Sequence, residues 1–143
     1  MAALAFSVTL VAAENPFVGT WKLNNAKSKF APDTETKEMK VVFEESGGQV
    51  KRVATGIDSD GEPVAETSVV AWDGKDHTIP GPGMTVAVVR SGRTLNVTLK
   101  REGKVVENAK LTVSKSGKTM TVIEKGVDQK QRALDNTEIF EKK

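Results

Sequence analysis

The chain has 143 residues, with 21 basic and 19 acidic side chains, a formal net charge of +2, one histidine and no cysteine. The absence of cysteine excludes disulfides, thiol nucleophiles and thiolate metal sites. Charges of both signs are interspersed and aromatic residues are few, whereas nucleic-acid-binding proteins gather Lys and Arg on one face and stack bases on aromatic rings, so no nucleic-acid partner is expected.

The first thirteen residues, MAALAFSVTLVAA, carry no charge and end in the small residues Val11, Ala12 and Ala13. This pattern is typical of the apolar core and cleavage site of a secretory signal, and the alternative is an ordinary buried first strand or helix. The run is too short to cross a bilayer. We therefore expect residues 1–13 to be a signal-peptide remnant and residues 14–143 to form one domain, located in the periplasm or secreted and with no membrane partner.

The next segment, from Asn15 to Leu23, contains a Gly-x-Trp pattern formed by Gly19 and Trp21. A glycine two residues before a tryptophan allows the backbone to bend tightly where a strand begins, while the indole turns inward. A ring of that size can plug one end of a barrel. The pattern predicts a first strand over residues 19–23 and a structural role for both residues.

From residue 37 onward, stretches rich in Val, Thr and Ile alternate with short stretches containing Gly or Asp, as in consecutive β-hairpins. The predicted strands are 38–45, 50–57, 64–72, 84–90, 94–100, 104–113, 119–125 and 131–140. Turn pairs such as Asp60-Gly61 and Ser91-Gly92 supply residues that tolerate positive φ. With no stretch of helical period, the pattern predicts an all-β fold, a barrel or a sandwich.

Alternation assigns the faces of some strands clearly, for instance the shared face of Leu95, Val97 and Leu99. In other strands charged residues fall in register with apolar neighbours. These residues are Arg52, Glu66, Arg90, Glu107 and Glu124. They either lie at strand ends and on the outer face, as burial statistics favour, or point inward and line a binding cavity, since buried charges are costly unless paired or used for a ligand.

Two connections are longer than a hairpin turn. Residues 24–36 include Phe30 among lysines and are expected to form a short helix or a lid, and residues 77–83 contain two Pro and two Gly just before Met84. Loops at the mouth of a barrel control the entry of a ligand, and the alternative is that both are plain connections.

Catalytic chemistry finds little support. His77 is the single histidine, which excludes a multi-histidine metal site, and no Gly-x-Ser-x-Gly elbow accompanies it. The run from Asp58 to Glu62 resembles the start of a calcium loop but lacks the later acidic ligands, so a hairpin turn explains it better. Glu66, Glu107 and Glu124 could meet across a barrel, although their spacing does not indicate glycoside hydrolysis. We expect no enzyme activity, no cofactor and no metal.

The opening NPFVGTWKLNNAKSKF, followed by short alternating strands, resembles that of small exported lipocalin-like proteins of bacteria. Beyond the opening, the resemblance is in the pattern of short strands and turns, which includes Trp72-Asp73-Gly74-Lys75-Asp76. It implies a lipocalin-like barrel whose floor is closed by Gly19 and Trp21. The sequence departs from the vertebrate-type transport proteins, because it has no second lipocalin motif, no disulfide and no C-terminal helix.

These observations together predict an up-and-down antiparallel β-barrel of about 8 to 10 strands, lipocalin-like, that binds a small apolar or amphipathic molecule in its interior. The alternative is a structural or protein-interaction module whose barrel is filled by its own side chains. An enzyme would require His77, Glu66 and Arg90, or a similar group, to converge in one cleft. The candidate ligand-binding residues are Phe30, Arg52, Glu66, Trp72, Met84 and Arg90.

Overall fold

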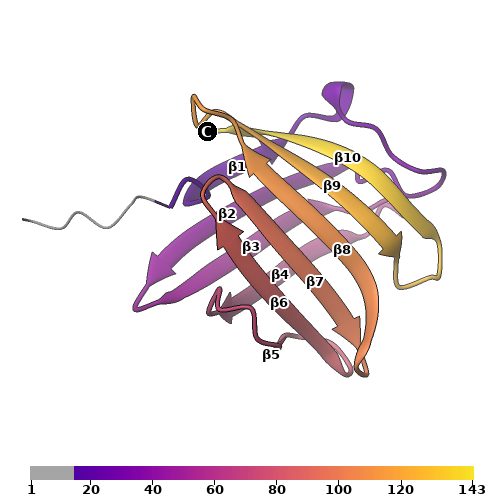
Figure 1. Ribbon diagram of the computed structural model, residues 1–143. Helices are drawn as coiled ribbons and strands as arrows, with labels where there is room; N and C mark the ends of the chain where they lie inside the picture. Colours follow the sequence, from indigo (N-terminus) through magenta and orange to yellow (C-terminus); the bar gives the residue numbers. More distant parts are fainter. Residues whose placement is uncertain (1–14) are drawn as a thin grey trace, which may run out of the picture.

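The computed structural model describes residues 15–143, so the predicted signal segment lies outside the described residues. The described part of the chain forms ten β-strands and one short 3-10 helix (Figure 1). The elements are β1 (Gly19–Leu23), η1 (Asn25–Lys27), β2 (Glu38–Ser46), β3 (Gln49–Ile57), β4 (Pro63–Val70), β5 (His77–Thr78), β6 (Met84–Ser91), β7 (Thr94–Arg101), β8 (Lys104–Val113), β9 (Thr119–Val127) and β10 (Ala133–Lys142).

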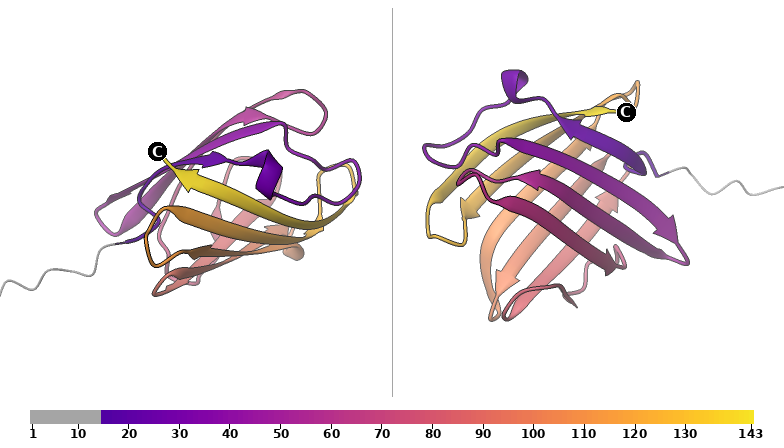
Figure 2. Two further views of the ribbon diagram at one scale, coloured as in Figure 1. Left: turned by 90° about the horizontal axis from the view of Figure 1, so that it is seen from above. Right: turned by 180° about the vertical axis from the view of Figure 1, so that it is seen from behind.

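The strands form one antiparallel sheet in which sequence neighbours pair, with β1 lying between β2 and β10. The sheet curls into a barrel that stays open between β4 and β5, as the two views of Figure 2 show. The prediction of an all-β, up-and-down barrel of 8 to 10 strands is therefore confirmed. In residues 15–143 no helix is long and apolar enough to span a membrane.

The predicted strand boundaries agree with the structure to within two residues. One difference concerns Trp72, which the sequence pattern places in a strand and which lies two residues beyond the end of β4. A second concerns His77, which the pattern places in a loop and which forms the short β5 with Thr78, paired with β6. Between β4 and β5 the chain lies along β6, where the backbone N–H of Gly74 donates to the carbonyl of Val88 at 3.0 Å.

One end of the barrel is filled by aromatic side chains, here called the floor: Phe17, Trp21, Phe43 and Trp72. Phe17 and Trp21 are fully buried, and the rings of Phe17, Phe43 and Trp72 pack edge to face with centroids 5.9–6.5 Å apart. Such contacts add to the free energy gained by burying apolar area. The surrounding core residues, including Leu95, are at most 8% exposed and Trp72 is half-buried, so this end is nearly closed to solvent.

Gly19 enters the floor with φ of +134°, and a Cβ atom built there would lie 2.8 Å from the side chain of Lys142. The backbone at this point requires a glycine.

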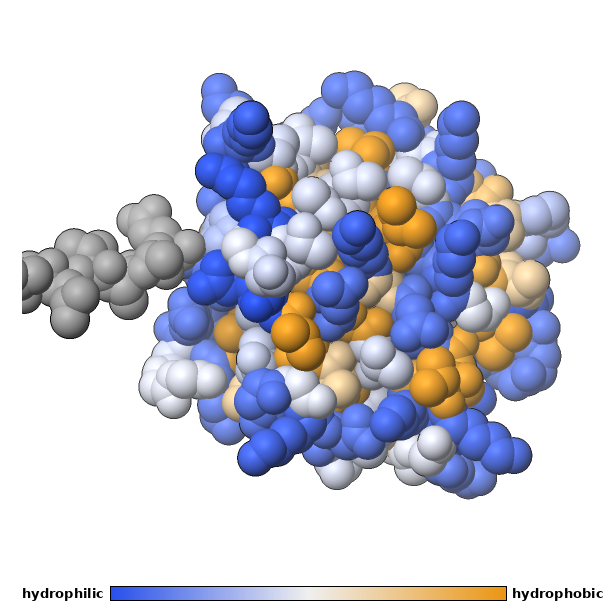
Figure 3. All heavy atoms as spheres, viewed as in Figure 1, coloured by the Kyte–Doolittle hydropathy of each residue, from blue (hydrophilic) through white to orange (hydrophobic). Residues whose placement is uncertain are grey.

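The opposite end is here called the mouth. Because antiparallel strands alternate in direction, the connections β1–β2, β3–β4, β5–β6, β7–β8 and β9–β10 all lie there. On the face drawn in Figure 3 the hydrophobic residues form small groups among hydrophilic ones. The most exposed large apolar side chains are Val69, Val89, Val105 and Ile123. The continuous apolar surface is therefore inside the barrel.

Candidate ligand site in the open half of the barrel

The half of the interior nearer the mouth is lined by side chains that point inward yet stay partly exposed. Directly paired residues of neighbouring strands share one face of a sheet. Val97, Ala109, Glu124 and Asn136 form such a row across β7 to β10, level with the inward-facing Val88 of β6. Val97, Ala109 and Glu124 are nevertheless half-buried, unlike the closed floor. The floor and this half of the interior therefore differ in how completely their inward side chains are covered.

Three glutamates face the interior here and form what we call the acidic cluster: Glu107 on β8, Glu124 on β9 and Glu138 on β10. Burial, reinforced by the charge of Glu124, raises the pKa of Glu107 well above the ordinary value of 4.5. The same two causes, in the same order, raise the pKa of Glu138. Both groups therefore hold a proton more tightly than an exposed glutamate does.

Arg52 lies on β3, and its charge opposes the rise in the pKa values of Glu107 and Glu138. Its guanidinium lies 3.7 Å from the carboxylate of Glu66 on β4. By register the inner face carries Glu66 and the acidic cluster beside the basic groups of Arg52 and Arg90.

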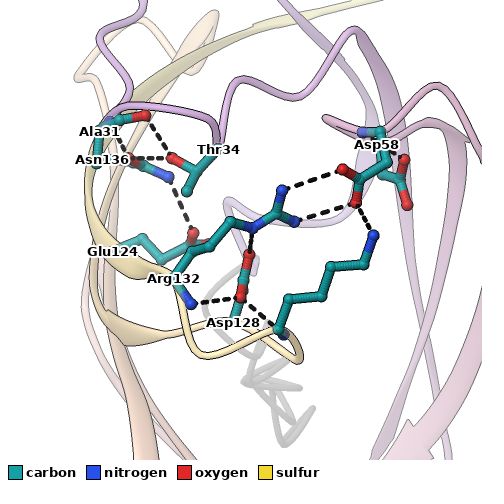
Figure 4. A network of polar contacts seen from close by, with 9 residues as sticks. Ala31, Thr34, Asp58, Glu124, Asp128, Arg132 and Asn136 are labelled. Atoms are coloured by element: carbon teal, nitrogen blue, oxygen red, sulfur yellow. Dashed lines mark hydrogen bonds and ion pairs between the residues drawn. The ribbon is translucent and has the colours of Figure 1, made fainter.

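Asn136 connects the acidic cluster to the connection between β1 and β2. It is only 2% exposed, and its Oδ1 accepts hydrogen bonds from the backbone N–H of Ala31 at 2.7 Å and the hydroxyl of Thr34 at 3.2 Å. Its Nδ2 donates to Glu124 at 3.4 Å. Figure 4 shows these contacts side by side. A buried amide with both ends bonded fixes the loop against the barrel wall.

The six candidate ligand-binding residues are not gathered at one place. Arg52 and Glu66 lie together on the inner face of β3 and β4, and Met84 lies half-buried on the inner face of β6, near the mouth. Trp72 belongs to the floor.

Arg90 lies on the inner face of β6 near its end, where it donates to the carbonyl of Gly92 at 3.1 Å. Phe30 lies in the β1–β2 connection and packs against the core. The register thus places the charged residues on the inner face, and their role in lining a binding cavity stays a prediction.

Sequence reasoning did not single out Glu138 or Asn136. The signal was present, because Leu134, Asn136, Glu138 and Phe140 alternate along β10 and Phe140 belongs to the core. Asparagine and glutamate at the two middle positions are typical of an outer face, and only Leu134 and Phe140 at the two ends mark this face as the inner one.

No arrangement typical of a metal centre is found in residues 15–143, where no three His, Cys, Asp or Glu side chains are grouped to hold an ion. His77 contacts Asp73 through Nε2 at 2.7 Å. The carboxylate of Asp58 is occupied by the backbone N–H groups of Asp60 and Glu62, each at 2.9 Å, so this run forms the hairpin turn that its sequence favoured.

A separate groove of about 570 Å³ lies on the outside of the barrel over β1, β2 and β3. Lys22 and Lys40, which are directly paired across β1 and β2, border it. It faces away from the acidic cluster.

Comparison with known proteins places the fold. Neither a protein-family model nor a curated protein sequence matches the chain. Among solved structures it is similar to the wild-type fluorescent protein UnaG, with a TM-score of 0.63 and 13% identity over 90% of this chain and 98% of that chain.

It is also similar to a point mutant of the REP1-NXSQ fatty acid transporter, with a TM-score of 0.57 and 13% identity over 88% and 97% of the two chains. A third similar structure is the zebrafish ileal bile acid-binding protein complexed with cholic acid, with a TM-score of 0.54 and 11% identity over 90% and 100%. Identities this low establish a shared lipocalin-like barrel fold and no more.

Proposed function

We propose that the protein binds a small, partly apolar molecule in the open half of its barrel. The observation that supports this most directly is the contrast between the two halves of the interior: the floor is closed by aromatic rings, whereas Val97, Ala109 and Glu124 point inward and stay partly exposed. The interior of a small barrel is either filled by side chains or holds one small ligand, and incompletely covered inward side chains favour the second arrangement. Similar barrels include a fatty acid transporter and a bile acid-binding protein, which also supports a binding role.

The residues of the open half indicate the chemistry of the ligand. Val97, Leu99 and Ala109 offer an apolar wall on β7 and β8, and the acidic cluster lies beside it. A protonated carboxyl donates a hydrogen bond, whereas an ionised one attracts a cation and repels a carboxylate. We infer a neutral or cationic amphipathic ligand, rather than an acid of the kind named for two of the similar barrels.

The test is a fluorescence titration with three apolar probes: the anionic anilinonaphthalene sulfonate, the neutral phenylnaphthylamine and a dansylated long-chain amine. Saturable one-to-one binding of the neutral and cationic probes, at about micromolar affinity, is expected for an apolar contact of modest size. The anionic probe should bind more weakly.

A matched pair of variants locates the site. Ala109→Leu adds volume to the inner face of β8 and should weaken binding, whereas Thr112→Leu on the outer face of the same strand should not. Lys40→Gln tests the outer groove and should also leave binding unchanged.

The alternative function is that of a module with a filled barrel and no ligand, which the closed floor supports. Absence of saturable binding of all three probes by the folded protein would reject the proposed function in favour of this module.

A further inference from the structure

The barrel wall is incomplete near the mouth, on the side where β1 is short. β1 pairs with β10 from Trp21↔Lys142 to Leu23↔Phe140, whereas β10 begins at Ala133, well before this pairing. The first part of β10 therefore has no partner strand on that side. This leaves a gap in the backbone ladder, here called the opening, between the first part of β10 and the β3–β4 hairpin.

Residues 24–36, here called the cover segment, run along this opening (Figure 2). Lys29 and Thr137 exchange two backbone hydrogen bonds of 2.7 and 2.8 Å, and Ser28 Oγ accepts from the N–H of Ile139 at 2.9 Å. The turn from Ala31 to Thr34 is then held by Asn136. The cover segment thus continues the sheet beside β10, but it reaches β10 only up to Asn136.

Beyond the cover segment, four charged residues join the two hairpin turns that flank the opening. Arg132 donates two hydrogen bonds to the Asp60 carboxylate at 3.0 and 3.1 Å and one from Nε to Asp128 at 2.6 Å, and Lys130 donates to Asp60 at 2.8 Å. Figure 4 shows Arg132 reaching from one turn to the other. We call Asp60, Asp128, Lys130 and Arg132 the clasp.

The two turns that carry the clasp have the same internal construction. Asp58 accepts from the N–H groups two and four residues later, and so does Asp128. In each turn the backbone N–H of the aspartate donates to the carbonyl four residues on, at 2.9 and 3.0 Å. Each turn is therefore rigid in itself, so the link between them depends on the charged side chains of the clasp.

The hydrogen bonds of the clasp are short, but its side chains are accessible to water. The pKa of Asp60 falls to about 2, chiefly through the hydrogen bonds from Arg132 and Lys130. The side chains of Arg132 and Asp60 keep 27% and 29% of their surface exposed, and that of Lys130 keeps 63%. Ion pairs with this much exposure are screened by salt and contribute little to global stability. The clasp can thus open locally while the barrel stays folded.

We propose that the clasp is a salt-sensitive gate: separation of Asp60 from Arg132 opens the wall beside the acidic cluster and sets the rate at which molecules enter and leave the interior. The identity of what passes rests on the proposed function, but access to the interior is measurable without any ligand.

The experiment uses the absence of cysteine from the chain. Ala109→Cys introduces one thiol on the inner face, and its reaction rate with the neutral reagent N-ethylmaleimide reports access. We expect Asp60→Ala, in the Ala109→Cys background, to raise that rate about fivefold or more at low salt, because Arg132 and Lys130 lose the acceptor that joins the two turns. Salt at about 0.5 M should raise the rate in the protein with an intact clasp and leave the Asp60→Ala protein unchanged.

Two controls separate gating from general loosening. Lys100→Gln removes an ion pair with Asp76 elsewhere on the barrel, where the two groups lie 2.9 Å apart, and should leave the rate unchanged. Thr112→Cys on the outer face should react fast in every background. Arg132→Gln, which cuts the same link from the other turn, should behave as Asp60→Ala does and replaces it if that variant does not fold.

Equal rates with and without the clasp would overturn the gate, and so would an equal increase in the Lys100→Gln protein. If the thiol responds as expected while the three probes do not bind, the gate stands and the proposed function fails. If the probes bind while the thiol does not respond, the function stands and the gate fails.

Discussion

The indole Nε1 of Trp21 donates a hydrogen bond of 2.9 Å to the carbonyl oxygen of Phe17, four residues earlier in the chain. Both side chains are fully buried. The bond therefore fastens the segment before β1 beneath the barrel, and Phe17 becomes part of the floor although it precedes the first strand. The ring of Trp21 and the entry of the chain are fixed by one contact.

Replacement of Trp21 tests the floor. Trp21→Ala should lower the free energy of unfolding by about 3 to 5 kcal/mol, because the cavity left by the ring cannot be refilled by the neighbouring side chains. Trp21→Phe keeps most of the volume, loses the hydrogen bond to Phe17 and should cost clearly less. Urea unfolding followed by circular dichroism measures both. A Trp21→Ala protein as stable as the wild type would contradict the role of the floor.

The acidic cluster should make stability depend on pH. The folded state raises the pKa values of Glu107 and Glu138 above 4.5, so it binds protons more tightly than the unfolded chain does. The free energy of unfolding is therefore expected to fall as the pH rises from 4.5 through the raised pKa values. Urea unfolding at pH 5, 7 and 9 measures the slope.

Neutral substitutes identify the groups responsible for that slope. Glu107→Gln and Glu138→Gln should each flatten it and stabilise the protein at high pH, since an amide cannot ionise. Glu44→Gln on the exposed face of β2 should have no such effect. A wild-type protein whose stability rises over the same pH range would show that the cluster is not strained when ionised.

The paired turns allow a stabilising change. Gln131 has φ of +62° at the position where the β3–β4 turn carries Gly61 with φ of +81°. Because side chains disfavour this region, Gln131→Gly should raise the free energy of unfolding by about 1 kcal/mol, and Gly61→Ala should lower it by a similar amount. Thermal unfolding compares the two. Destabilisation by Gln131→Gly would mean that its side chain makes a contact worth more than the strain.

Asn136 should hold the cover segment. Asn136→Ala leaves the N–H of Ala31 without its acceptor and the carboxylate of Glu124 without its donor, so we expect a loss of about 1 to 3 kcal/mol. Hydrogen exchange at Ala31 should accelerate more than exchange in β7. The matched variant Asn96→Ala, on the outer face of β7, should change neither quantity. Unaltered exchange at Ala31 would show that other contacts hold the segment.

Export remains a prediction from the sequence. The uncharged run and the small residues that end it predict cleavage after Ala13 and a mature protein that begins at Glu14. N-terminal sequencing of protein from the periplasm or medium of its host tests this. Intact Met1 on a cytosolic product would remove the prediction.

The fold was predictable because its signals are local. Alternation at Leu95, Val97 and Leu99 and glycines in turns define strands without knowledge of their partners, and the alternation also brought Glu107 and Glu124 into register with inward residues. The clasp was not predictable, because Asp60 and Arg132 are 72 residues apart and meet only where the barrel curls past a first strand that is too short. Contacts of that kind depend on tertiary closure, which no single turn encodes.

The missing ladder between β4 and β5 has a mechanical consequence. A barrel in which every strand is hydrogen-bonded to both neighbours has a fixed circumference, because widening it would break backbone hydrogen bonds along a whole strand. In this barrel the ladder is interrupted between β4 and β5. There the backbone N–H of Gly74, in the connection between these strands, donates a hydrogen bond to the carbonyl of Val88 on β6. The barrel can therefore widen or narrow between β4 and β5 while the nine ladders stay intact, so the volume that it encloses is adjustable.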